Sequence, residues 1–78
     1  MTTVTFLFTG RFDTASFAEF ARHRAARLAL ATEPPHLSPE KVRITVSGED
    51  DLVDAFEMAC SLGPIDCLVA DVTRRPES

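Results

Sequence analysis

Residues 9–25, TGRFDTASFAEFARHRA, join the end of a strand-like run to a glycine, an arginine and the start of a helix-like pattern. Backbone N–H groups in a loop of this kind can surround an anion, and an arginine beside the loop adds a charged donor. The chemistry that this segment suggests is therefore anion binding. The candidate ligand-binding residues in it are Gly10, Arg11, Thr14, Ser16 and Arg22.

Asp13 opposes an anion at this position. It is a favourable helix N-cap, and Phe12 before it can pack on Phe17 at the fourth helical position as a hydrophobic staple. Ser16 and Glu19 form a competing capping box, so a helix begins between residues 13 and 17. In either case the Asp13 carboxylate repels or displaces an incoming phosphate, because the two carry like charge at short range.

Arg22 offers one way to restore positive charge near the loop. It lies one turn after Ala18, and helical side chains tilt towards the N-terminus, so its guanidinium could cover the surface beside Ala18. Glu19 is three residues before Arg22, which favours a solvated arginine instead. His36 is a further candidate ligand, acid or base, although a lone histidine beside two prolines is typical of a solvated edge.

No metal or cofactor site is expected. Cys60 and Cys67 have neither a second cysteine pair nor suitably spaced histidines, so both are interpreted as reduced core thiols. The acidic run at residues 49–57 lacks the spacing of a calcium loop and is interpreted as the solvated face of a helix. We expect arginines of the preceding helix to neutralise these acids. Those arginines are Arg22, Arg24 and Arg27.

Composition and charge argue against several classes of partner. The 78 residues carry a formal net charge of −4 and include no Tyr or Trp, which opposes nucleic-acid binding through neutralised phosphates and aromatic stacking. No apolar run approaches the roughly 20 residues of a membrane-spanning helix, and the first residues lack a secretory signal pattern. We therefore expect a cytoplasmic protein that binds neither nucleic acid nor membrane.

The first half of the chain predicts a strand and a helix. Val4, Phe6 and Phe8 alternate with Thr and Leu residues up to Gly10, which is the period-two pattern of a half-buried strand. An apolar stripe with helical spacing follows and extends the helix to about Leu30. The stripe consists of Phe17, Ala21, Ala25 and Leu28.

The second half predicts an edge segment, a strand, a helix and a last strand. The three prolines within residues 31–41 restrict that segment to an edge strand or a loop. Alternation at residues 42–46 predicts a strand, and the acidic turn at residue 49 begins a helix that stops at Gly63-Pro64. Residues 65–72 are rich in β-forming residues, and 73–78 have the composition of a frayed tail.

This order of elements is the ferredoxin-like βαββαβ plan of the α+β class, an antiparallel sheet with two helices on one face. We expect one domain over residues 1–78, with a core from about residue 3 to 72 and a tail beyond it. Weak pairing of residues 34–39 would leave the strand at 42–46 with an open edge, which predicts a homodimer. The predicted core residues are Phe6, Phe8, Phe17, Leu28, Val42, Ile44, Val46, Phe56, Cys67 and Val69.

The sequence resembles acylphosphatases over roughly residues 4–72. Members of that family carry a G-R-V-Q-G-V-G-F-R motif and then A-x-x-L-x-L, and this chain has GRFDTASFA at residues 10–18 and AARLAL at 25–30. Residues 48–56 and 63–72 resemble the family patterns G-x-E-E-x-V-x-x-F and G-P-x-x-A-x-V-x-x-V. The resemblance implies the ferredoxin-like fold and, for the family, hydrolysis of acyl phosphates.

The same resemblance implies that the two groups of the family's chemistry are absent. The arginine that binds the acyl phosphate corresponds to Ala18, and the asparagine that positions the attacking water corresponds to His36. Thr14 and Ser16 replace loop glycines, which makes an anion-binding curl of the backbone costlier. The hypothesis is a non-catalytic acylphosphatase-like domain, a small interaction or ligand-sensing module for an unknown protein or small anionic ligand. The alternative is an acylphosphatase or related anion hydrolase with a rearranged phosphate site.

Overall fold

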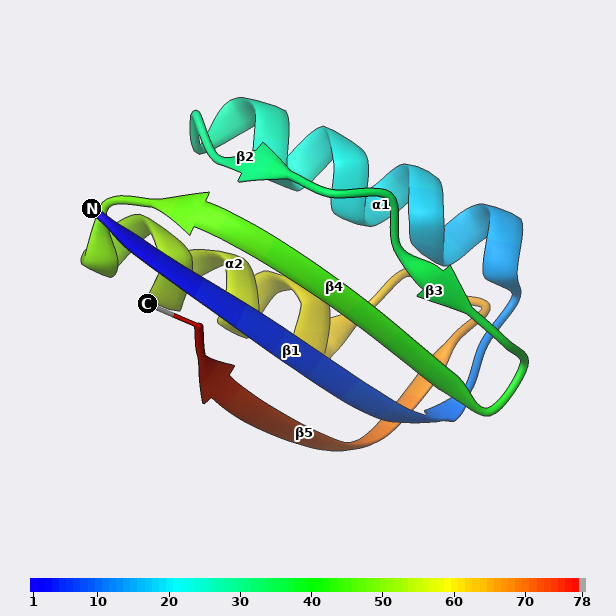
Figure 1. Ribbon diagram of the computed structural model, residues 1–78. Coiled ribbons are helices and arrows are strands. Elements are labelled where there is room, and N and C mark those ends of the chain that lie inside the picture. Colours follow the sequence, from blue (N-terminus) through cyan, green and yellow to red (C-terminus); the bar gives the residue numbers. More distant parts are fainter. Residues whose placement is uncertain (78) are drawn as a thin grey trace.

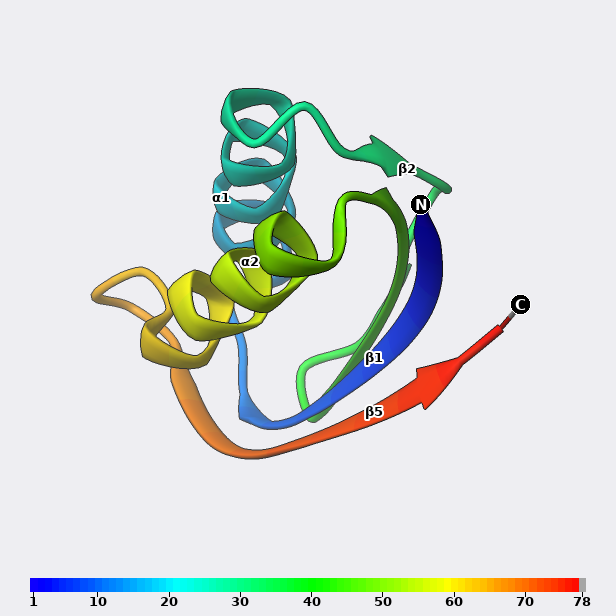
Figure 2. The ribbon, with the colours of Figure 1, turned by 90° about the vertical axis from the view of Figure 1, so that its left-hand side faces the viewer.

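Five strands and two helices make up a two-layer α+β domain. The computed structural model describes residues 1–77. Both helices pack against the concave face of one curved antiparallel sheet and leave the other face uncovered (Figures 1 and 2). The expected ferredoxin-like arrangement is confirmed. The elements are β1 (Thr2–Arg11), α1 (Thr14–Arg27), β2 (Ala31–Thr32), β3 (His36–Leu37), β4 (Lys41–Gly48), α2 (Asp50–Leu62) and β5 (Leu68–Pro76).

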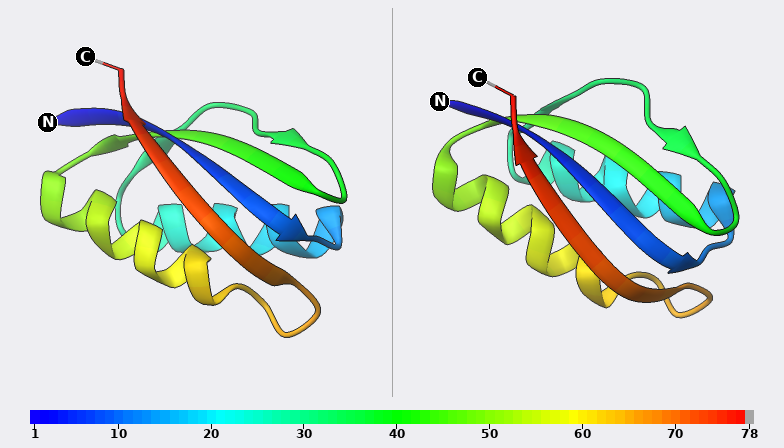
Figure 3. Two further views of the ribbon diagram at one scale, coloured as in Figure 1. Left: turned by 90° about the horizontal axis from the view of Figure 1, so that it is seen from below. Right: turned by 60° about the horizontal axis from the view of Figure 1, so that its bottom comes forward.

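The central strand β1 sets the register of the sheet. It pairs antiparallel with β4 on one side and with β5 on the other, while β2 and β3 both pair with the outer edge of β4 (Figure 3). Phe6 lies opposite Ile44, and Phe8 lies opposite Val42. Because side chains alternate along a strand, all four of these residues point to the helix face.

The core lies between this sheet face and the two helices. Phe6 and Phe56 have ring centroids 6.0 Å apart, and Phe8 and Phe17 are in edge-to-face contact at 5.5 Å. Leu28, Cys67 and Val69, which we expected in the core, are only partly buried at its margin. Leu28 follows the last turn of α1, while Cys67 and Val69 lie before and within the outer strand β5. The buried residues are Val4, Phe6, Phe8, Phe12, Phe17, Ala21, Ala25, Leu30, Val42, Ile44, Val46, Val53, Phe56 and Cys60.

Helix α1 ends three residues before the expected end near Leu30. Ala29 adopts a φ of 56°, and its N–H donates to Ala26 O while the N–H of Leu30 donates to Ala25 O at 2.9 Å. These are the two hydrogen bonds of a Schellman motif, in which a left-handed residue terminates the helix. Leu30 is buried against the core, but it lies beyond the end of the helix.

The proline-rich segment forms two short pairings rather than one strand. Ala31 and Thr32 pair with β4, and His36 and Leu37 pair with it again after Pro34 and Pro35. The interruption follows from the chemistry of proline, which has no N–H to donate to a sheet. This segment covers part of the β4 edge, so a homodimer through that edge stays a prediction that light scattering can test.

Strand β5 continues through residues 73–76, where the sequence led us to expect the start of a tail. Leu7 lies opposite Thr73 and Val4 lies opposite Pro76, and the N–H of Glu77 donates to Thr3 O at 2.8 Å. Pro76 is compatible with this pairing because it ends an outer strand. The ladder joins residues far apart in sequence, so local composition did not reveal it.

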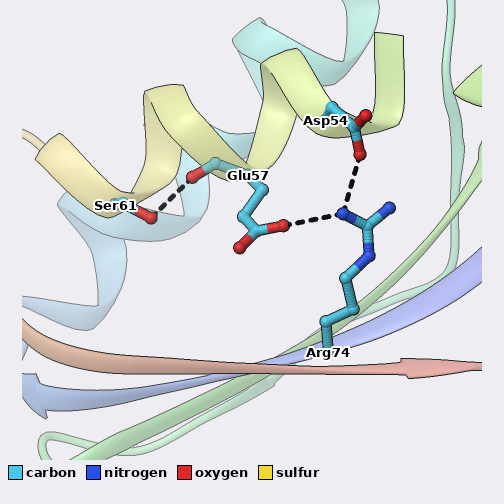
Figure 4. Close-up of polar contacts among 4 residues, drawn as sticks. All are labelled: Asp54, Glu57, Ser61 and Arg74. Carbon is cyan, nitrogen blue, oxygen red and sulfur yellow. Dashed lines mark hydrogen bonds and ion pairs between the residues drawn. The ribbon is translucent and has the colours of Figure 1, made fainter. Parts of the chain in front are cut away.

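Arg74 of β5 pairs with two acidic residues of α2. Its Nη1 lies 2.7 Å from Asp54 Oδ1 and 2.9 Å from Glu57 Oε1 (Figure 4). The guanidinium also lies 5.4 Å from the centroid of the Phe6 ring, so its charge is placed over the core aromatic. The expectation that arginines of α1 would pair with these acids is wrong, because within residues 1–77 Arg74 makes the ion pairs to α2.

Candidate functional site

The N-terminus of α1 is capped by a carboxylate of the chain itself. Asp13 has an extended backbone, and its Oδ1 accepts a hydrogen bond from the Ser16 N–H at 3.0 Å. Phe12 and Phe17 pack edge to face with centroids 4.9 Å apart, as the hydrophobic staple predicts. The helix begins at Thr14, so Thr14 and Ser16 belong to its first turn instead of an open loop.

A second carboxylate reaches the same turn from the loop before β5. Ser16 Oγ donates to Asp66 Oδ1 at 2.9 Å, across a separation of 50 residues. The hollow beside this turn has a volume of about 630 Å³, and Asp13 and Glu19 are its acidic lining residues. The Ser16 N–H is already bonded to the Asp13 carboxylate, and the Asp66 carboxylate lies beside the Ser16 hydroxyl. The turn is therefore poorly suited to an anionic ligand.

The Cys67 thiol lies next to these carboxylates. Its Sγ is 3.8 Å from the backbone oxygen of Asp13 and 3.8 Å from Asp66 Oδ1. Partial burial, followed by the negative charges of Asp66 and Asp13, raises the pKa of the Cys67 thiol, although its hydrogen bond to the Asp13 backbone acts in the opposite direction. Cys67 is thus held in its neutral form, which is the less nucleophilic one.

Gly10 is required by the sheet. It adopts a φ of 154° at a register shift between β1 and β5. A Cβ added there would lie 2.0 Å from Leu68 O and 2.9 Å from Ala70 N, both of them backbone atoms. The close approach of the two strands accounts for this glycine without any ligand. Its N–H already donates to Glu40 O at 3.1 Å.

Arg11 is exposed at the end of β1. It lines a cavity of about 540 Å³ together with Asp13, Glu40 and Asp66. The three carboxylates outnumber the single guanidinium. An anion entering this cavity would therefore meet net negative charge, and the ligand-binding role of Arg11 stays a prediction.

Arg22 lies on a different side of α1. It lines a cavity of about 460 Å³ with Ala18, Glu19 and Pro34, and core side chains such as Ile44 also line that cavity. Arg22 is exposed and forms no ion pair within residues 1–77, which agrees with the expected solvated arginine, and it shares a cavity with Ala18. Glu19 lies 3.9 Å from His23.

His36 is separated from these groups. It is an exposed residue of β3 that lies opposite Arg43, and the two line a cavity of about 140 Å³ with Leu7. Arg22 and His36 line no common cavity among those described. The six candidate residues are therefore distributed over the end of β1, the N-terminus of α1, the side of α1 and the β3 edge.

Asp66 is a residue of the candidate site that the sequence did not indicate. It is one of several acids in the chain, and nothing in the pattern around Ile65 indicates that it turns back to Ser16. Within residues 1–77, no three His, Cys, Asp or Glu side chains are grouped so that they could hold a metal ion. None of the described helices is long and apolar enough to cross a membrane.

The fold and the capped helix define a small ferredoxin-like domain, and its solved structural neighbours are acylphosphatases. The acylphosphatase from Bacillus subtilis has a TM-score of 0.89 and 21% identity, over 99% of this chain and 86% of that one. An acylphosphatase from Coxiella burnetii has a TM-score of 0.89 and 23% identity, over 99% and 81%. The chain thus has the acylphosphatase type of ferredoxin-like fold. No protein-family model matches the sequence, and a comparison with curated proteins finds no match.

Proposed function

We propose that this chain is a non-catalytic acylphosphatase-like domain that works as a small interaction or ligand-sensing module. The observation that carries the proposal is the hydrogen bond from the Ser16 N–H to Asp13 Oδ1. The first turn of a helix attracts anions because its N–H groups are unpaired and its dipole is positive there. In this domain an internal carboxylate occupies that position, so an acyl phosphate would have to displace it.

Three further observations support the proposal. Ala18 supplies no guanidinium, and Asp66 adds a second negative charge beside Ser16. His36, at the position that the resemblance assigns to the water-positioning asparagine, faces Arg43 on the sheet. A hydrolase of this class needs a held anion and a positioned water in one place. The groups described above do not meet in such an arrangement.

The test is hydrolysis of acetyl phosphate by the purified chain, with a heat-inactivated sample as the blank. We expect no turnover above the blank and no measurable binding of inorganic phosphate by calorimetry. Turnover above the blank that persists through a second purification step would refute the non-catalytic function.

A reconstruction experiment tests the reason for the lost site. Asp13→Asn keeps a capping side chain but removes its charge, and Ala18→Arg adds a guanidinium at the position that the resemblance assigns to the phosphate-binding arginine. We expect the double variant to bind inorganic phosphate measurably. The matched control combines Asp13→Asn with Ala26→Arg, which adds the same charge at an exposed position of α1 distant from the turn. Equal phosphate binding by both double variants would mean that added charge, and not the site, is responsible.

The alternative is a hydrolase with a rearranged phosphate site, and one observation favours it. Arg22 lines the same cavity as Ala18 and forms no ion pair within residues 1–77. If the wild-type chain binds phosphate, Arg22→Ala should abolish the binding while Arg27→Ala, at an exposed position of the same helix, leaves it unchanged. That result would replace the non-catalytic function with the alternative.

A further inference from the structure

The sheet face that no helix covers is turned toward the viewer in Figure 1 and is called here the open sheet face. Its centre consists of two rows of residues across the three long strands. In one row Leu7 of β1 lies between Arg43 of β4 and Thr73 of β5. In the next row Thr5 lies between Thr45 and Arg75.

This centre is positively charged although the chain as a whole is acidic. Arg43 and Arg75 are both exposed, they line one cavity of about 540 Å³, and neither forms an ion pair within residues 1–77. Lys41 adds a third cation one row further along β4. One acid, Asp71, lies on the same face: it is opposite Thr9, one row from Leu7, and its carboxylate accepts a hydrogen bond from the adjacent Val72 N–H.

The formal charge of −4 is therefore distributed unevenly over the molecule. Acidic residues gather on α2, on the other side of the sheet, where Asp54 and Glu57 pair with Arg74. Such a separation orients an approaching acidic partner with its charge toward the open sheet face. Complementary charge is the property that a partner of this face must have.

The positions of the two arginines also indicate how long the partner segment must be and where it must carry an apolar side chain. Arg43 is a direct neighbour of Leu7, whereas Arg75 is its diagonal neighbour on the opposite side. Direct neighbours on adjacent strands are about 5 Å apart and diagonal neighbours about 7–8 Å. The Cα atoms of the two arginines are therefore roughly 12 Å apart, with Leu7 between them. In an extended peptide, residues i and i+4 are about 13 Å apart and point to the same side as residue i+2.

We propose that the open sheet face binds an extended acidic peptide segment with the pattern acid-x-apolar-x-acid. The two carboxylates pair with Arg43 and Arg75, and the apolar side chain between them lies on Leu7. Arginine suits this role because its planar guanidinium can bind a carboxylate through two parallel hydrogen bonds. The inference rests on the proposed function, since it names the partner of an interaction module.

The composition of the face favours a peptide over a nucleic acid. No aromatic side chain occupies its two central rows, whereas the core phenylalanines Phe6, Phe8 and Phe56 are buried on the helix side. Single-stranded nucleic acids are held chiefly by stacking of bases on aromatic rings together with many phosphate contacts. Two arginines flanking a leucine match a short peptide instead.

Hydrogen bonds between hydroxyl groups link neighbouring strands on this face. Thr5 Oγ1 lies 2.8 Å from Thr45 Oγ1, and Thr3 Oγ1 lies 2.8 Å from Ser47 Oγ. These cross-strand hydrogen bonds fix side chains beside the arginines, so the surface needs little reorganisation to receive an extended segment.

The test uses fluorescence anisotropy with the full chain and a labelled peptide that contains Glu-Ser-Leu-Ser-Glu. We expect saturable binding that weakens when the salt concentration rises from 50 to 500 mM, because the charge pairs are exposed to solvent. Arg43→Gln and Arg75→Gln should each weaken binding about tenfold. A peptide with Ser in place of Leu should bind severalfold more weakly. The matched control is Arg27→Gln, which removes one positive charge from α1 and should leave the affinity unchanged.

Three outcomes would overturn the proposal. The first is no saturable binding at millimolar peptide, and the second is the same loss of affinity in the Arg27→Gln control as in the two sheet variants. The third is tighter binding of a single-stranded oligonucleotide than of the peptide. Unchanged melting temperatures show that the variants are folded, as expected for exposed positions. Acetyl phosphate turnover in the same preparation would refute the proposed function separately and would leave the peptide result standing.

Discussion

Asp13 and Ser16 are joined by a hydrogen bond of 3.0 Å, from the backbone N–H of Ser16 to Oδ1 of Asp13, and this contact gives the first turn of α1 an internal anion. Ser16 is bonded a second time, through its hydroxyl, to Asp66. One short turn thus binds two carboxylates of the same chain. The domain has the fold of the acylphosphatases to which it is similar, and its own carboxylates stabilise the N-terminus of its first helix.

The first prediction separates the cap of Asp13 from its charge. Asp13→Ala removes the acceptor for the Ser16 N–H and should lower the free energy of unfolding by about 1 kcal/mol. Asp13→Asn retains a capping oxygen and should cost only a few tenths of that amount. Urea unfolding followed by circular dichroism measures both. Equal losses in the two variants would indicate that the charge of Asp13, and not its hydrogen bond, stabilises the helix.

The second prediction concerns Gly10. Gly10→Ala places a methyl group against Leu68 O and Ala70 N, so either the strand pairing opens or the backbone is strained. We expect a loss of about 2 kcal/mol or more in the free energy of unfolding. The control is Gly63→Ala, where φ is 66° but the nearest atoms are at least 3.5 Å away, and where about 1 kcal/mol is expected. A Gly10→Ala variant as stable as the control would contradict the close approach of the strands.

Much of the fold could be predicted because its signals are local. The alternation of Val4, Phe6 and Phe8 indicates a strand with one buried face, and these three residues are buried. Asp13 as N-cap and the packing of Phe12 on Phe17 also follow from short-range pattern, and both are observed. Each signal lies within a few residues of the structure that it specifies.

The contacts that could not be predicted join distant parts of the chain. The hydrogen bond of Ser16 to Asp66 and the ion pairs of Arg74 with α2 depend on how the sheet positions β5. Arg74 stands in a polar stretch with Pro76, and only the register with β1 makes that stretch a strand. The same applies to Arg43 and Arg75, which become neighbours of Leu7 through pairing alone.

The third prediction tests the end of β5. A chain that stops after Val72 loses the pairing of residues 73–76 with β1 and the Arg74 ion pairs above Phe6. We expect its free energy of unfolding to fall by about 2–4 kcal/mol, since each lost ladder bond contributes about 1 kcal/mol. A chain that stops after Glu77 keeps the hydrogen bond from the Glu77 N–H to Thr3 O; it is the control and should change by less than about 0.5 kcal/mol. Equal stability of both truncated chains would mean that residues 73–76 add nothing to the sheet.

The fourth prediction concerns the two thiols, which the sequence led us to treat alike. Cys60 has no exposed surface, and its burial raises the pKa of the thiol to about 12. Cys67 is only half-buried, and burial together with the charges of Asp66 and Asp13 raises its pKa above the usual value. At pH 8 without denaturant, a maleimide should therefore label Cys67 slowly and leave Cys60 unlabelled.

The pH dependence of that labelling follows from the raised pKa of Cys67. Only the thiolate reacts, and its fraction rises about tenfold per pH unit below the pKa, so the rate should increase from pH 7 to pH 9 without levelling off. Asp66→Asn removes a charge that disfavours the thiolate and should speed labelling at pH 8. The control is Glu49→Gln, which removes an exposed acid at the N-terminus of α2 and should leave the labelling rate unchanged. Mass spectrometry of the intact chain counts the labels and peptide mapping assigns them. Equal labelling of Cys60 and Cys67 in the native state would contradict the burial of Cys60, and an unchanged rate in Asp66→Asn would contradict the effect of its carboxylate on Cys67.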